Sequence, residues 1–240
     1  MSTVDQPETF RYSLDLLKSY SSAALRNSKA LLDEARLLLE NRHYARAYFL
    51  AVSSIEETGK ASQTFAAQGR DLSDPGVTAK LVRSTESHSE KITAAFIAWI
   101  NAGDNVRNSL MSAVDLMIAL KRGREPAMYS VVNRISGELF EPIEVVRPTA
   151  ARDCVKIAGN CLAHTETQLS VQNPAKMTAA QDKMFAMKSG KVNELLNAED
   201  FWRYFISRLE NNDEDLAAAV IDYQTHYVAK KRLYVDSKEE

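Results

Sequence analysis

Apolar residues at helical spacing run through almost the whole chain, and few residues interrupt them. Only 8 glycines and 6 prolines occur among 240 residues, while apolar side chains recur every three or four positions. Because residues at this spacing share one face of an α-helix, the pattern predicts helices that each bury one side. The chain is also long enough to close a substantial hydrophobic core. The sequence therefore predicts an all-α protein that folds as one domain over residues 1–240.

The first part of the chain divides into four predicted helices. They cover residues 14–40, 43–67, 75–100 and 106–120. Asp74 is expected to cap the third helix, whose first position is Pro75. The helical period is lost between Gly123 and Pro148, where two extended segments flank Ser136 and Gly137. This region predicts a short extended or hairpin insertion around residues 128–146.

Helices resume after this insertion. Thr149 is the expected cap of a helix that runs to about Leu169, and Asn173-Pro174 opens another helix that Gly190 closes. Two further helices are predicted over residues 201–209 and 216–234. Residues 171–240 are therefore expected to form a C-terminal helical extension that packs on the preceding helices.

Composition and charge exclude several classes of protein. The formal net charge is −2, from 30 basic and 32 acidic side chains, so no global field attracts nucleic acid. No apolar run approaches the about 18 residues of a membrane span, and residues 1–10 do not resemble a signal peptide. Cys154 and Cys161 are seven residues apart in a helical stretch, too far apart for a disulfide. We therefore expect a cytoplasmic protein with reduced cysteines in its core.

A group of charges interrupts the second helix, which otherwise favours burial on nearly every side. Glu56, Glu57, Gly59 and Lys60 lie together in the stretch "SIEETGKASQ". Buried charges are unfavourable unless they are paired or functional, and glycine inside a helix costs about 1 kcal/mol relative to alanine. One interpretation is an ordinary Glu56–Lys60 pair on an exposed turn. The other is a buried polar site, with Gly59 allowing another backbone or a ligand to approach.

Basic residues elsewhere offer partners for these carboxylates. In one continuous third helix, His88 is in register with Leu81 and Ile92, so its ring is expected to face inward. Lys91 lies one turn further on and Arg83 five residues upstream. A histidine on an apolar face is also compatible with a purely structural core role. Lys121 and Arg124 belong to the run "KRGRE" at the end of the fourth helix, where cations also favour the helix dipole.

Several segments together resemble the AbiV family of abortive-infection proteins, a branch of the HEPN superfamily. The matching stretches are "NSKALLDEARLLLENRHYARAYFLAVSSIEETGK" at residues 27–60, "HSEK" at residues 88–91 and "REPAMY" at residues 124–129, followed by the helix from Thr149. The resemblance covers about residues 20–170. It implies an HEPN-like helical bundle, homodimerisation and defence against phage by shutting down the host cell.

The resemblance also implies an activity, because many HEPN proteins are ribonucleases with an arginine four to six residues before a histidine. Arg83 and His88 have this spacing. We therefore expect a metal-independent endoribonuclease that acts on RNA in the cytoplasm without a cofactor. The expected catalytic residues are His88, Arg83, Glu56, Lys60 and Lys91. Lys121, Arg124 and Glu57 are expected to bind substrate, and a phage-encoded protein is a possible activator.

Two other readings remain open from the sequence. The first is a non-catalytic helical module that recognises a phage protein or a nucleotide, with shutdown carried out by a partner. The second is a metal site made by Glu56, Glu57 and His88. This site is disfavoured because the chain has no Glu-x-x-His or His-Glu-x-x-His pair to complete it.

Overall fold

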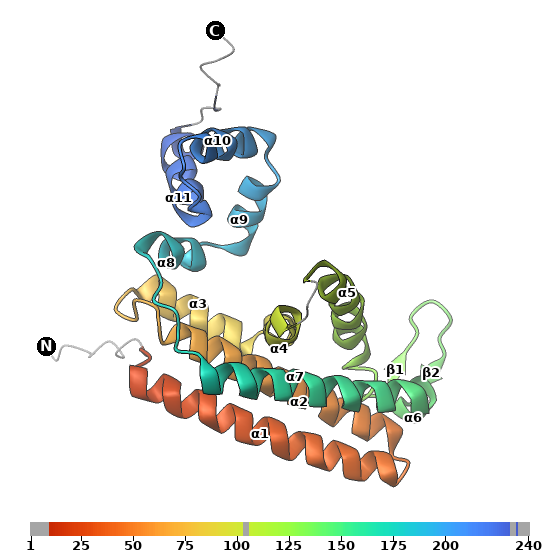
Figure 1. Cartoon of the computed structure of the whole chain (residues 1–240). Coiled ribbons are helices and arrows are strands. Elements are labelled where there is room, and N and C mark those ends of the chain that lie inside the picture. The colour runs from red at the N-terminus through yellow and green to blue at the C-terminus, as the bar shows by residue number, and fades with distance from the viewer. Residues whose placement is uncertain (1–9, 103–105, 231–233, 235–240) are drawn as a thin grey trace, which may run out of the picture. The chain divides into compact units, whose positions relative to one another are not determined.

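The computed structural model describes residues 10–102, 106–230 and 234 and is built mainly of helices (Figure 1). This confirms the predicted all-α class. The α-helices of the described residues are α1 (Leu14–Glu40), α2 (Tyr44–Ala67), α3 (Pro75–Glu86), α4 (His88–Ala102), α5 (Val106–Gly123), α6 (Pro142–Val145), α7 (Pro148–Val171), α8 (Ala179–Ala186), α9 (Ser189–Leu196), α10 (Glu199–Glu210) and α11 (Leu216–His226). The strands are β1 (Val131–Val132) and β2 (Leu139–Phe140), and a 3₁₀ turn covers Val228–Lys230.

The chain divides into two compact units, and one of the boundaries between them falls inside α3. Residues 13–68 and 81–175 form what we call the larger unit. The described residues of 1–12, 69–80 and 176–240 form the smaller unit. The single domain expected from the sequence, with an extension packed on it from residue 171, stays a prediction.

Helix α2 is the central element of the larger unit. It packs against α1, α4 and α7 (Figure 1). Small and β-branched side chains allow this close contact on several sides, and Ala47, Ala51, Val52 and Ile55 are fully buried. Burial all round explains why α2 has no polar face and why its charged residues must find partners inside the protein.

Two kinds of close contact bring neighbouring helices near to α2. The hydroxyl of Ser28 on α1 lies 3.0 Å from the Ser54 hydroxyl and 2.7 Å from the Thr58 hydroxyl, so small polar side chains satisfy one another between the helices. On another side, a Cβ atom at Gly59 would lie 1.8 Å from the backbone oxygen of Lys91 on α4. The prediction that Gly59 permits a close backbone approach is therefore confirmed.

The predicted third helix is wrong in one respect, because it is two helices. α3 ends at Glu86 and α4 begins at His88. Ser87 lies between them, and its hydroxyl accepts a hydrogen bond from the Glu90 amide at 3.3 Å. Ser and Glu at this spacing are typical of a capping box, which starts a new helix. The cap prediction for Asp74 is confirmed, since its carboxylate accepts hydrogen bonds from the Gly76 and Val77 amides.

Other boundaries also differ from the sequence prediction. Thr149 lies inside α7, because Arg147 is the cap and Pro148 occupies the first helical position. The expected helix from Asn173 to Gly190 is replaced by a non-helical segment, followed by α8 with Thr178 as its cap. Gly190 does not end a helix but lies within α9.

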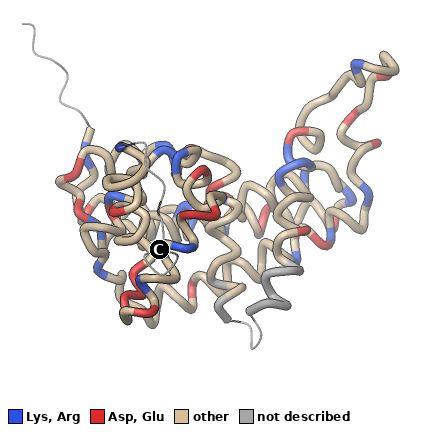
Figure 2. The backbone as a smooth tube through the Cα atoms, turned by 90° about the horizontal axis from the view of Figure 1, so that it is seen from above, with Lys and Arg blue, Asp and Glu red and all other residues tan. Residues whose placement is uncertain are grey.

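The predicted hairpin insertion is confirmed in a shorter form. Val131 pairs with Phe140 and Val132 with Leu139 in an antiparallel two-stranded sheet. The segment after β2 is not extended, because Pro142 at the first position starts the short helix α6. The hairpin projects from the helices of the larger unit in Figures 1 and 2.

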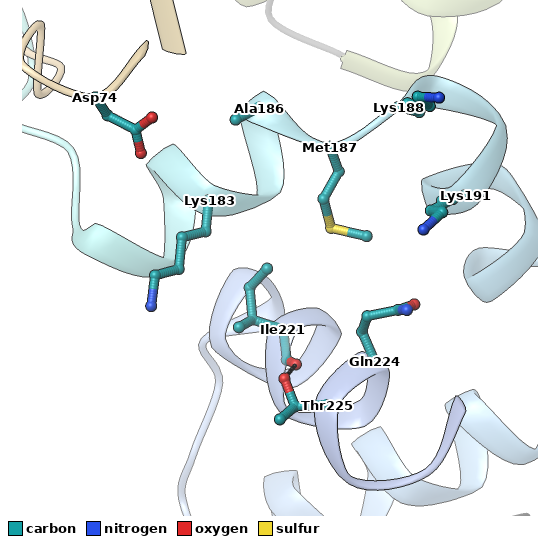
Figure 3. A pocket seen from close by; sticks show the side chains of 9 residues that line it. All are labelled: Asp74, Lys183, Ala186, Met187, Lys188, Lys191, Ile221, Gln224 and Thr225. Carbon is teal, nitrogen blue, oxygen red and sulfur yellow. Dashed lines mark hydrogen bonds between the residues drawn. The ribbon is translucent and has the colours of Figure 1, made fainter. Parts of the chain in front are cut away.

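The smaller unit has its own core, formed mainly by aromatic side chains of α10 and α11. Phe201 and Tyr223 are buried and meet edge to face, with ring centroids 5.5 Å apart. Met184 and Met187 pack against this core. A pocket of this unit is lined by Lys183, Lys188 and Lys191 around the apolar Met187 and Ile221 (Figure 3).

Further expectations concern single residues and the chain ends. Cys154 and Cys161 are buried and not bonded to each other. No described helix combines the length and the apolar character that a bilayer crossing requires. Residues 1–9, where no signal peptide is expected, and residues 231–233, within the last predicted helix, lie outside the described residues.

The contact at Gly59 leads to a stability prediction. We expect Gly59→Ala to lower the free energy of unfolding by about 1–3 kcal/mol or more, because the new methyl group would clash with the backbone of Lys91. Gly159→Ala in α7 is the control, because its Cβ would lie 3.5 Å from the movable end of Arg36. Urea denaturation of both variants tests this. A Gly59→Ala variant as stable as Gly159→Ala would show that α2 and α4 are not in close contact.

Candidate functional site

The carboxylate of Glu56 on α2 contacts three basic side chains within the described part of the larger unit. Its side chain is only 7% exposed. One oxygen, Oε2, lies 2.7 Å from Nδ1 of His88 and 3.1 Å from Nζ of Lys91. The other oxygen, Oε1, lies 2.7 Å from Nε of Arg124. We call Glu56, His88, Lys91 and Arg124 the Glu56 cluster.

Local structure brings these four residues together from three distant segments. His88 is the first residue of α4, and Lys91 lies three residues later on the same side of the helix. The contact at Gly59 holds this first turn of α4 against α2. Arg124 comes directly after Gly123, the last residue of α5, where a Cβ atom would lie 2.4 Å from the Tyr48 hydroxyl. The lack of a side chain at both glycines therefore determines where the cations meet Glu56.

Opposing effects act on the protonation of Glu56. Burial alone raises the pKa of this carboxyl group, but the hydrogen bonds from His88 and Lys91 and the charges of Lys91 and Arg124 outweigh it, so the pKa is lowered. Glu56 is therefore ionised at neutral pH. The buried ammonium of Lys91, 8% exposed, is balanced by this carboxylate.

His88 differs from the other members of the cluster because its ring is 55% exposed. The predicted inward orientation is wrong, because His88 is the first residue of α4 and its ring lies exposed at the end of that helix. Glu56 nevertheless reaches the ring and occupies Nδ1. No hydrogen-bond partner for Nε2 is found among the described residues. One ring nitrogen is thus held by a carboxylate while the other is free for a ligand.

Lys60 and Glu57 form a separate ion pair on α2. The Glu56–Lys60 pair, one of the two interpretations offered by the sequence, is wrong, because Lys60 binds Glu57, three residues away. Burial lowers the pKa of the Lys60 ammonium, but the hydrogen bond to Glu57 raises it above its ordinary value. The ammonium also lies 5.7 Å from the centre of the Tyr20 ring. Lys60 and Glu57 neutralise each other beside the Glu56 cluster and do not form part of it.

The remaining candidates, Arg83 and Lys121, are exposed cations without contact to Glu56. Arg83 lies on α3, and its backbone oxygen accepts the Ser87 amide at the helix break. Lys121 donates a hydrogen bond to the Thr93 hydroxyl of α4 at 3.1 Å. Sequence reasoning also misses Phe49, whose ring centre lies 5.6 Å from the guanidinium of Arg124. The spacing of Phe49 and Glu56, seven residues apart on one side of α2, is a signal that could have identified it.

The residues do not favour the metal site considered from the sequence. Glu57 is bound to Lys60, and Glu56 has two permanent cations and a histidine around it. A positive metal ion would be repelled by Lys91 and Arg124. Within the described ranges, no three His, Cys, Asp or Glu side chains are grouped as a metal site requires.

Removal of the central carboxylate should destabilise the larger unit. We expect Glu56→Gln to lower the free energy of unfolding by about 3 kcal/mol or more, because Lys91 becomes a buried charge without its counter-ion. Asp33→Asn is the control, since it breaks an exposed pair with Arg36 and should cost less than about 1 kcal/mol. Equal stability of the two variants, measured by urea denaturation, would contradict burial of the Glu56 cluster.

The lowered pKa of Glu56 predicts how this effect depends on pH. A carboxyl group with a lowered folded pKa stabilises the fold above its unfolded pKa of about 4.3. This contribution is lost as the pH falls through the folded pKa. The stability difference between wild type and Glu56→Gln should therefore be largest near pH 7 and shrink in acid. A difference that stays constant down to pH 3, measured by urea titrations at several pH values, would refute the ionised state.

Comparison with known proteins identifies the family. The family model HEPN_AbiV, described as AbiV, matches residues 16–163 and so includes every member of the Glu56 cluster. No curated protein and no solved structure matches the chain in the corresponding comparisons. The match spans more than half of the chain. The chain therefore belongs to the AbiV family of the HEPN superfamily, which implies a role in abortive-infection defence against phage.

Proposed function

We propose that the protein is an abortive-infection effector that cleaves RNA at the Glu56 cluster without a metal ion. The observation that supports this most strongly is the hydrogen bond of 2.7 Å between the buried Glu56 carboxylate and Nδ1 of the exposed His88 ring. A carboxylate at one nitrogen holds the ring in place. The other nitrogen is then available to exchange a proton with a substrate.

RNA supplies the nucleophile for such a reaction. The 2′-hydroxyl attacks the adjacent phosphorus and loses its proton, and the bond from phosphorus to the 5′-oxygen breaks. The 5′-oxygen takes up a proton, so the products are a 2′,3′-cyclic phosphate end and a 5′-hydroxyl end. Nε2 of His88 takes or delivers one of these protons, and no metal-bound water is required.

The phosphate carries additional negative charge in the transition state and needs cations nearby. Arg124 binds Glu56 through Nε only. Its two terminal nitrogens have no hydrogen-bond partner within the described part of the chain, so they are available to phosphate oxygens. Arg83 and Lys121 are exposed cations on the neighbouring α3 and α5. Lys91 is buried and serves to hold Glu56 ionised, while Lys60 and Glu57 support α2 from the side.

The protein would act on RNA as a homodimer in the cytoplasm and would shut down RNA-dependent processes of the host. The net charge of −2 means that the protein as a whole does not attract RNA, so binding needs a local concentration of basic side chains. A dimer that brings two sites together would supply such a concentration. Figure 2 shows that basic and acidic residues are interspersed along the chain. RNA binding therefore has to depend on local cations. A phage-encoded activator is proposed as the trigger.

The role of His88 is tested by its replacement. His88→Ala should lower RNA cleavage by about 10²- to 10⁴-fold, the usual contribution of a positioned proton-transfer group. Its melting temperature should change little, because the ring is half exposed and makes one contact within the cluster. The measurement is cleavage of total RNA by the purified variant, with thermal unfolding followed on the same sample. Wild-type cleavage should persist in excess EDTA.

A matched control and the opposite outcomes make this test decisive. His43→Ala removes another exposed histidine, at the start of α2, and should cleave RNA at the wild-type rate. A folded His88→Ala variant with wild-type activity would exclude His88 from catalysis. Absence of any cleavage by wild-type protein would favour the alternative function, a non-catalytic module that recognises a phage protein or a nucleotide.

A further inference from the structure

The hairpin of the larger unit exposes more large apolar side chains than any other described segment of similar length. Eight large apolar side chains are exposed within 17 residues: Tyr129, Val131, Val132, Ile135, Leu139, Phe140, Ile143 and Val145. Ile135 at its tip is 99% exposed. Soluble monomers rarely gather so many apolar groups in one exposed region. The hairpin is therefore expected to have a partner.

The backbone of the hairpin also has unused hydrogen-bonding groups. A two-stranded hairpin is marginally stable in water by itself. The Asn133 amide donates to the Glu138 oxygen at 2.8 Å, so these residues form a hydrogen-bonded pair. Hydrogen-bonded and non-hydrogen-bonded pairs alternate along antiparallel strands. Val132 and Leu139, the next pair, therefore direct their backbone amides and carbonyls outward, to opposite edges of the sheet.

The two edges differ in charge. β2 is flanked by the carboxylates of Glu138 and Glu141, whereas β1 is flanked by the uncharged Ser130 and Asn133. Charged side chains beside an edge strand oppose pairing with another chain. β1 has no such protection, and both of its residues are valines, which favour strands. The open edge of β1 is therefore the one suited to another strand.

We propose that β1 pairs with β1 of a second copy of the chain, in antiparallel orientation around a two-fold axis. Val132 of one copy then lies beside Val132 of the other, and Arg134 lies opposite Ser130. No like charges face each other in this register. Pairing through β2 would instead gather four carboxylates, Glu138 and Glu141 of both copies. The result is a four-stranded sheet in the order β2–β1–β1–β2, with the same surface used on both subunits.

The hairpin that forms this interface lies close in sequence to Arg124 of the Glu56 cluster. The amides of Met128 and Tyr129 bond to the backbone oxygen of Glu125, so one tight turn connects Arg124 to the start of the hairpin. The proposal rests on the homodimer of the proposed function and names its surface. It does not depend on RNA cleavage, and the two can fail separately.

Cysteine substitution tests the pairing directly. In the proposed register, the Cα atoms of the two Val132 residues are about 5.5 Å apart, within the range that a disulfide spans. Val132→Cys should therefore form a covalent dimer under mild oxidation, seen on a non-reducing gel. Cys154 and Cys161 should not interfere, because burial raises the pKa of both thiols well above the ordinary value. Wild-type protein should give no covalent dimer.

Leu139→Cys is the matched control for random collisions. Val132 and Leu139 have nearly equal exposure, 58% and 61%, and lie opposite each other in the hairpin. Leu139→Cys should stay at least about tenfold less cross-linked than Val132→Cys. The two β1 strands are one strand spacing of about 4.8 Å apart, whereas the two outer β2 strands are about three such spacings apart, too far for a disulfide. Equal cross-linking of both variants, or none of Val132→Cys, would overturn the proposal.

Light scattering of the full chain provides an independent measurement. Wild-type protein should be a dimer at micromolar concentration. Val132→Pro removes the outward amide of β1 and should raise the dimer dissociation constant at least tenfold, whereas Leu139→Pro on the other edge should leave it unchanged. A monomeric wild type would mean that some other partner covers the hairpin and would overturn the pairing. Cross-linking by Val132→Cys alongside the absence of any RNA cleavage by wild-type protein would instead refute only the ribonuclease.

Discussion

The larger unit depends on the ionised carboxylate of Glu56, which is buried in the protein and contacts two cations, Lys91 and Arg124, and the ring of His88. A buried charge is tolerated only when groups of opposite charge are well placed around it. Removal of one member of such a cluster leaves the remaining buried charges without compensation. Here the partners come from α4 and from the turn after α5. The same ion cluster therefore joins the helices and places His88 and Arg124 beside each other. Stability and the proposed chemistry have a common physical origin.

The members of this cluster divide into those that hold the fold and those that face solvent. Lys91 is buried and balances Glu56, while His88 exposes half of its ring. Arg124 lies between these cases, since it binds Glu56 through one nitrogen and leaves two others available. Histidine oriented by a carboxylate, next to a free guanidinium edge, is a suitable arrangement for proton transfer beside a phosphate. This arrangement is the physical basis of the proposed ribonuclease.

The sequence predicts most of the helices, the importance of Glu56 and the basic residues that surround it, but not which carboxylate Lys60 binds. Periodicity locates α1 and α2 closely because burial repeats at helical spacing. It misses the break at Ser87, because the spacing of Leu81 and Ile92 also fits one continuous helix. The spacing of Ser87 and Glu90, typical of a capping box, is the signal that could have located the break. The sequence does not identify the ion-pair partner of Lys60, because Glu56 and Glu57 are both within reach of Lys60 along α2. Tertiary contacts from α4 and Arg124 decide between them, and no local pattern contains that information.

The most direct measurement of the central claim is the protonation pattern of the His88 ring in solution. Long-range proton–nitrogen NMR correlations distinguish a ring that carries its proton on Nδ1 from one that carries it on Nε2. If Glu56 orients His88, neutral His88 should carry the proton on Nδ1, and Glu56→Gln should abolish this preference. A neutral ring protonated mainly on Nε2 in the wild-type protein, as in an unconstrained histidine, would contradict the account.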